Sequence, residues 1–96
     1  MVIWSEPAKA DLRSIHDFIA KDSSFYAKKV VQDIREKTDV LNDLPKMGKK
    51  VAEVNDEAIR ELSLYSYRII YEAKSQQAEV LAVIHKRLDF KAEDLP

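Results

Sequence analysis

The spacing of the hydrophobic residues changes once along this chain. Between residues 8 and 44 they recur every three or four positions, which is the period of a helix with one buried face. From residue 58 to residue 87 the period falls close to two, as in a β-strand. The segment LPKMGKK, residues 44–50, separates the two patterns and holds the only glycine. This order predicts an α+β domain in which the helices precede most of the strands.

The first pattern predicts an antiparallel helical hairpin. Ser5 stands before Glu6 and Pro7, so we expect it to cap the first helix. The short break Asp22–Ser24 should start the second helix, which is expected to end near Leu44. The buried faces are expected to be Ala8, Leu12, Ile15 and Ile19 on the first helix, and Ala27, Val30, Val31, Ile34, Thr38 and Leu41 on the second.

The second pattern predicts a sheet. Residues 2–4, 58–64, 67–73 and 78–87 are expected to be strands, and the last three are joined by connections short enough for an antiparallel meander. Residues 80–84 are apolar on both faces, which favours a central position between 67–73 and 2–4. We therefore expect one domain, residues 1–96, with a four-stranded sheet packed on the hairpin and a loosely held tail, 88–96.

Composition narrows the function classes. The 16 basic and 17 acidic residues nearly cancel, so a nucleic acid would have to bind at a local patch. There are no cysteines and only two histidines, and we expect no metal site and no cofactor. No apolar run is long enough for a membrane helix and no secretion signal is visible, so we expect a cytoplasmic protein that does not contact membranes.

Basic residues near the strand ends are the candidate site. Alternation along 78–87 is expected to put Leu81, Val83, His85 and Arg87 on one face and Lys86 on the other. If the strands pair as expected, the open side of the sheet gathers Arg60, Arg68, His85 and Arg87. Arginines bind phosphate and histidine exchanges protons near neutral pH, which are the minimal requirements for cutting RNA. The alternative is a set of ordinary surface ion pairs with Glu61, Glu72, Glu79 or Asp89.

Four stretches resemble the RelE/ParE family of bacterial toxins. They are VIWSEPAKADLRSIHDFIA, LNDLPKMGKKV, IRELSLYSYRIIYEA and VLAVIHKRLDF, in the order in which the family has them, and they cover roughly residues 2–90. The resemblance implies the same strand, hairpin and meander fold. It also implies a growth-arresting toxin of a type II toxin–antitoxin module, neutralised by a cognate antitoxin that alone contacts operator DNA.

The family contains two mechanisms, and the resemblance bears on both. In RelE-like members, which cut mRNA on the ribosome without a metal, Arg68 and Arg87 would match catalytic arginines and His85 would be the acid or base. ParE-like members inhibit DNA gyrase. Here Leu62 stands where the nucleases have a second basic residue beyond Arg60, and no tyrosine follows Tyr71, with Phe90 and Glu93 in that region.

The resemblance therefore favours the ParE-like branch, with gyrase as the target. A ribosome-dependent endoribonuclease and an inactive antitoxin-binding remnant are the alternatives. Whether the toxin acts on gyrase or on the ribosome, the expected target- or phosphate-binding residues are Arg60, Arg68, His85, Lys86 and Arg87.

Overall fold

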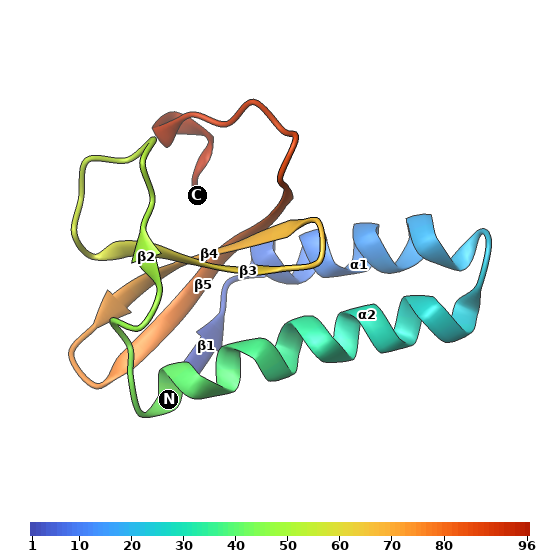
Figure 1. Cartoon of the computed structure of the whole chain (residues 1–96), viewed down its shortest axis with the longest axis horizontal. Helices are drawn as coiled ribbons and strands as arrows, with labels where there is room; N and C mark the ends of the chain where they lie inside the picture. The colour runs from blue at the N-terminus through green and yellow to red at the C-terminus, as the bar shows by residue number, and fades with distance from the viewer.

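A helical hairpin covers one face of a five-stranded sheet in the computed structural model, which describes residues 1–96 (Figure 1). Neither helix is long and apolar enough to cross a membrane. The elements, in chain order, are β1 (Val2–Trp4), α1 (Glu6–Ala20), α2 (Ser24–Lys37), a 3-10 helix (Thr38–Asn42), β2 (Lys49–Lys50), β3 (Ile59–Leu64), β4 (Tyr67–Lys74), β5 (Gln77–His85) and a second 3-10 helix (Ala92–Asp94).

Both long helices begin at a serine cap. The hydroxyl oxygen of Ser5 accepts a hydrogen bond from the amide of Ala8 at 3.1 Å, which confirms the predicted start of α1. At α2 the same role falls to Ser23, whose hydroxyl accepts from the amide of Tyr26 at 3.2 Å. These caps satisfy amide groups that have no partner within the helix.

The second helix is shorter than predicted. It ends at Lys37 rather than near Leu44, and the chain continues as a 3-10 helix. The change occurs at Thr38, whose buried hydroxyl donates to the carbonyl of Arg35 at 2.7 Å. Leu41 is still fully buried, so the apolar spacing continues through a change of helix type.

The strand order is β1-β5-β4-β3-β2. Strands β3, β4 and β5 form the predicted antiparallel meander, and β1 pairs with β5 in parallel, so the order of the four expected strands is confirmed. The two-residue strand β2 was not predicted, because two lysines carry no strand periodicity. It is positioned by the amide of Gly48, which donates to the hydroxyl of buried Tyr71 at 2.9 Å.

A β-bulge changes which residues of β5 share a face. Ile70 pairs with Ala82 but Tyr71 pairs with Val80, so Leu81 is an extra residue on β5. Val80 and Val83 therefore both pack against the helices, whereas Leu81 belongs to the cluster on the other side. The prediction that Leu81 and Val83 lie on the same face is wrong, because a strict alternation cannot anticipate a bulge.

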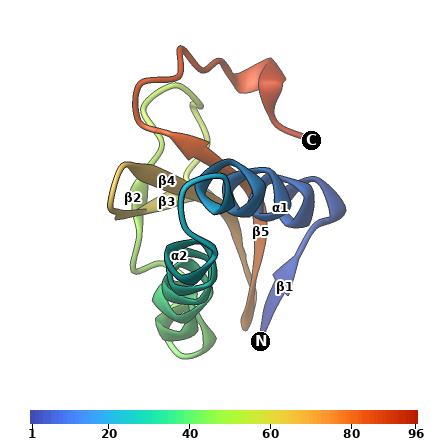
Figure 2. The ribbon, with the colours of Figure 1, turned by 90° about the vertical axis from the view of Figure 1, so that its right-hand side faces the viewer.

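The sheet separates two hydrophobic clusters. The larger lies between the helices and the sheet and includes Leu12, Ile34 and Tyr71. The smaller lies on the face turned away from the helices, called here the open face, and includes Ile70 and Phe90. Figures 1 and 2 both show the C-terminal segment and α2 on opposite sides of β3 and β4. Phe90 is only 5% exposed, so this part of the tail is packed rather than loose as expected.

Candidate functional site on the open face of the sheet

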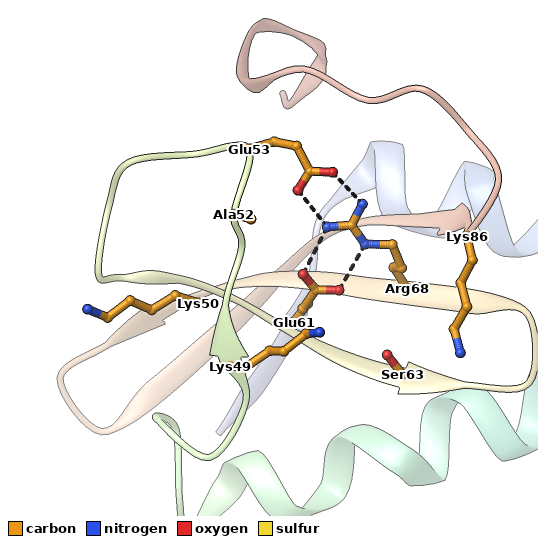
Figure 3. Close-up of a pocket in the computed structure, with 8 residues that line it drawn as sticks. All are labelled: Lys49, Lys50, Ala52, Glu53, Glu61, Ser63, Arg68 and Lys86. Carbon is orange, nitrogen blue, oxygen red and sulfur yellow. Dashed lines mark hydrogen bonds and ion pairs between the residues drawn. The ribbon is translucent and has the colours of Figure 1, made fainter.

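A charged pocket of about 480 Å³ lies on the open face, centred on Arg68 (Figure 3). Its walls come from β2 and the loop that follows it, from β3 and β4, and from the residue after β5. We call it the Arg68 pocket, and its lining residues are Lys49, Lys50, Ala52, Glu53, Glu61, Ser63, Arg68 and Lys86.

Two carboxylates hold the guanidinium of Arg68. Its Nε and Nη2 donate to the two oxygens of Glu61, and its Nη1 and Nη2 donate to the two oxygens of Glu53, all at 2.8 Å. The side chains of Arg68 and Glu61 are 13% and 4% exposed, and that of Glu53 is 33% exposed. The ring of Phe90 lies against the guanidinium, 5.4 Å from its carbon to the ring centroid.

These contacts favour the charged forms of Glu53 and Arg68. Hydrogen bonds from Arg68 lower the pKa of Glu53 to about 2, and the charge of Lys49 acts in the same direction. The hydrogen bonds to Glu53, and to a smaller extent those to Glu61, raise the pKa of Arg68 above its ordinary value. Each of the two ion pairs is a pair of parallel hydrogen bonds. At neutral pH Arg68 is thus a charged group, and four of its five N–H donors are already used by the protein.

Arg60 lies away from this pocket. Its partner across the strands is Tyr71, which is buried against the helices, whereas Arg68 pairs with Ser63 on the open face. Cross-strand partners point to the same face, so the two arginines point to opposite faces. Arg60 instead donates from Nη1 to the carbonyl of Gly48 at 2.9 Å, which holds the chain at the start of β2.

His85 also faces the helical side. Its ring meets that of Tyr67 edge to face, with 5.8 Å between centroids, and Tyr67 packs against the larger core. Its Nδ1 accepts a hydrogen bond from the amide of Arg87 at 3.1 Å, so the neutral imidazole carries its proton on Nε2. Arg87 stands exposed in the turn after β5 and forms no ion pair.

The expected gathering of Arg60, Arg68, His85 and Arg87 on the open side is therefore wrong. The face assignments of Arg60 and His85 caused the error, since the register of β3, β4 and β5 turns both residues away from Arg68. The structure does bring Lys86 to the Arg68 pocket. For Arg68 the alternative of an ion pair with Glu61 is confirmed in its partner, but the pair is mostly buried rather than at the surface.

Sequence reasoning missed Glu53 altogether. This residue lies in the irregular segment between β2 and β3, where no periodicity indicates which way a side chain points. No local pattern could have identified it, because the position of Glu53 depends on the path of this loop, whereas the pairing of Arg68 with Glu61 is among the alternatives that the sequence indicates.

The structure also shows where the residues lie that distinguish the two expected mechanisms. Leu62 packs against the helical core rather than lining the pocket, and Phe90 covers the guanidinium where a catalytic tyrosine was considered. Glu93 is exposed in the tail. No group of three or more histidine, cysteine, aspartate or glutamate side chains is arranged to ligate a metal.

Comparisons with known proteins agree with this fold. A solved structure described as the chromosomal ParDE TA system from P. aeruginosa superposes with a TM-score of 0.72 and 24% sequence identity, covering 88% of this chain and 92% of that one. At this identity the likeness shows a common fold. No curated protein matches the sequence. The family described as the ParE toxin of the type II toxin–antitoxin system parDE matches residues 2–90. The chain therefore belongs to the ParE family of type II toxins.

Proposed function

We propose that this toxin arrests growth by inhibiting DNA gyrase, without cutting RNA, and that a cognate antitoxin neutralises it. The observation that carries the choice of mechanism is the engagement of Arg68 by Glu61 and Glu53. A nuclease of this architecture would need that guanidinium free for the scissile phosphate.

Catalysis of RNA cleavage requires several groups to converge on one phosphate. A base takes the proton of the ribose hydroxyl, an acid protonates the leaving oxygen, and cations stabilise the charge that develops between them. In this protein His85 and the mostly buried Arg68 lie on opposite faces of the sheet. The buried carboxylate of Glu61, which stays on Arg68, would also repel the extended negative charge of an RNA strand.

Inhibition of an enzyme by contact has no such requirement. His85, Lys86 and Arg87 follow one another at the end of β5, and all three are exposed. Exposed polar residues of this kind can dock on a protein surface whose charges are complementary. We assign these three residues to target contact, with Arg87 as the main anchor because its guanidinium has no ion-pair partner within the chain.

The antitoxin part of the proposal draws support from family membership and from the surface. The related P. aeruginosa structure is described as a ParDE toxin–antitoxin system. Near the turn of the helical hairpin Phe18, Phe25 and Tyr26 are each at least 60% exposed. Large exposed apolar side chains of this kind mark protein-interaction sites. With a net charge of -1, the toxin itself is a poor ligand for DNA, so operator binding is assigned to the antitoxin.

The test is induction of this chain alone in bacteria, with nucleoid staining and mapping of mRNA 5′ ends in the same culture. We expect growth arrest, a DNA-damage response and intact transcripts, and growth should resume when the cognate antitoxin is co-expressed. Codon-phased cuts in mRNA would instead establish the ribosome-dependent nuclease. Normal growth at high expression would establish the inactive remnant.

A further inference from the structure

We propose that the Arg68 pocket is a binding site for a carboxylate side chain of a partner protein, and that Glu53 occupies this site in the free toxin. The ligand is an aspartate or glutamate presented by a protein segment, which displaces Glu53 into solvent. This site shares Lys86 with the proposed target contact but not His85 or Arg87, and it does not depend on the identity of the toxin's target.

The two carboxylates on Arg68 differ in how firmly they are held. Glu61 lies within β3, between two paired strands, and its side chain is 4% exposed. Glu53 belongs to the loop between β2 and β3, and its side chain is 33% exposed. Displacing Glu61 would leave a buried charge without a partner, whereas Glu53 can move into water by rotation about its side-chain bonds. Glu53, at the outer edge of Arg68, is therefore the only one of the two carboxylates that another ligand can replace.

The geometry at that outer edge is already that of a bound carboxylate. Nη1 donates to one oxygen of Glu53 and Nη2 donates to the other, both at 2.8 Å, so the carboxylate and guanidinium meet through two parallel hydrogen bonds. Glu61 and the ring of Phe90 fix the orientation of the guanidinium before any ligand arrives. A site prepared in this way spends little binding free energy on ordering its own side chain.

The surrounding charge favours an anion of limited size. Lys49 and Lys86 line the pocket, and neither forms an ion pair within the chain. Figure 3 shows Lys50 pointing away from Arg68, and its Nζ pairs with Glu57 at 3.4 Å. These cations attract a carboxylate, while the buried Glu61 beside Arg68 disfavours the extended negative charge of a nucleic acid. These charges point to a protein ligand.

Binding is measured by NMR titration of the full chain, following the Nε–H signal of Arg68. The probe is the peptide acetyl-Glu-Ala-Glu-Ala-Glu-amide, and its counterpart with glutamine at each glutamate is the control ligand. Glu53→Ala should bind the acidic peptide about tenfold more tightly than the wild type, because the occupied state no longer competes. The glutamine peptide should cause no shift of the signal in either protein.

A matched variant separates release of the site from a simple change in net charge. Glu57→Ala removes an equal charge from the same loop without touching Arg68, and its affinity should stay within about twofold of the wild type. Lys49→Gln in the Glu53→Ala background should weaken peptide binding several-fold. Circular dichroism and the melting temperature of each variant confirm that it is folded.

Three results would overturn the proposal. One is equal peptide affinity in Glu53→Ala and the wild type when both are folded. Another is an equal gain in Glu57→Ala. The third is tighter binding of inorganic phosphate than of the acidic peptide, which would assign the pocket to a phosphate ligand.

Discussion

Arg68 on β4 and Glu61 on β3 meet edge to edge, with Nε and Nη2 of the arginine donating to the two carboxylate oxygens at 2.8 Å each. The pair is mostly buried, so solvent does little to weaken it. Because Arg68 also binds Glu53, the pair connects strands β3 and β4 to the loop that carries Glu53. The same contact decides whether Arg68 is a structural residue or a phosphate ligand.

Glu61→Gln should therefore destabilise the fold. The variant keeps the shape of the side chain but turns an amide donor toward the guanidinium donors, at an expected cost of about 1–3 kcal/mol. Urea denaturation measures the change. Glu57→Gln, which alters an exposed pair with Lys50, should cost under about 1 kcal/mol. An unchanged midpoint in Glu61→Gln would show that the pair contributes nothing to stability.

The Glu53–Arg68 contact should give the protein a distinct acid sensitivity. Hydrogen bonds from Arg68 lower the pKa of Glu53 from 4.5 to about 2. The folded state therefore holds this proton less readily than the unfolded chain, and the contact stabilises the fold fully above about pH 4.5. The stabilisation is lost as the pH falls toward 2.

Comparison with Glu53→Gln isolates this contribution. The difference in unfolding free energy between wild type and variant should be constant above about pH 5 and shrink steadily as the pH falls below it. Denaturant titrations at a series of pH values measure it. A difference that stays the same down to pH 2 would contradict the lowered pKa of Glu53.

The helical hairpin should depend on Ile34, which is fully buried between α2 and the sheet. Truncation to alanine removes three carbons from a packed core and should cost about 2–5 kcal/mol. Ile3→Ala, at a position on β1 that is 37% exposed, is the control and should cost clearly less. Equal denaturant midpoints for the two variants would argue against the packing described.

His85 and Arg87 should differ in their effect on toxicity. His85→Ala should change growth arrest only mildly, because Arg87 is the main anchor of the proposed target contact and no proton transfer is assigned to the imidazole ring. Arg87→Ala should weaken target contact about tenfold or more, since exposed arginines are frequent interface anchors. Growth curves at matched expression, with folding checked by circular dichroism, compare the two. Loss of toxicity in His85→Ala alone would reverse these roles.

Most of the fold could be predicted from hydrophobic spacing, helix caps and the lengths of the connections. Helix caps such as Ser5 and the order of the long strands follow from local patterns and short connections, and both are present. The bulge at Leu81 and the two-residue strand β2 could not be predicted, because each depends on tertiary contacts. The hydrogen bond between Gly48 and Tyr71 joins residues 23 positions apart, and no local pattern encodes it.

The candidate site was harder to predict than the fold. Arg68 was recognised as a distinctive residue, but its surroundings depend on strand register and on a loop. A shift of one residue moves a side chain to the other face, which is why Arg60 and His85 were placed with Arg68. Glu53 could be found only once the path of its loop was known.

DNA supercoiling by purified gyrase, assayed with increasing amounts of this toxin, tests the central claim most directly. Supercoiling should stop once the molar amount of toxin equals that of gyrase. Prior addition of the cognate antitoxin should prevent this inhibition. The same preparation should leave mRNA intact on programmed ribosomes. Unimpaired supercoiling at a large excess of folded toxin, together with mRNA cleavage that disappears in His85→Ala, would contradict the account.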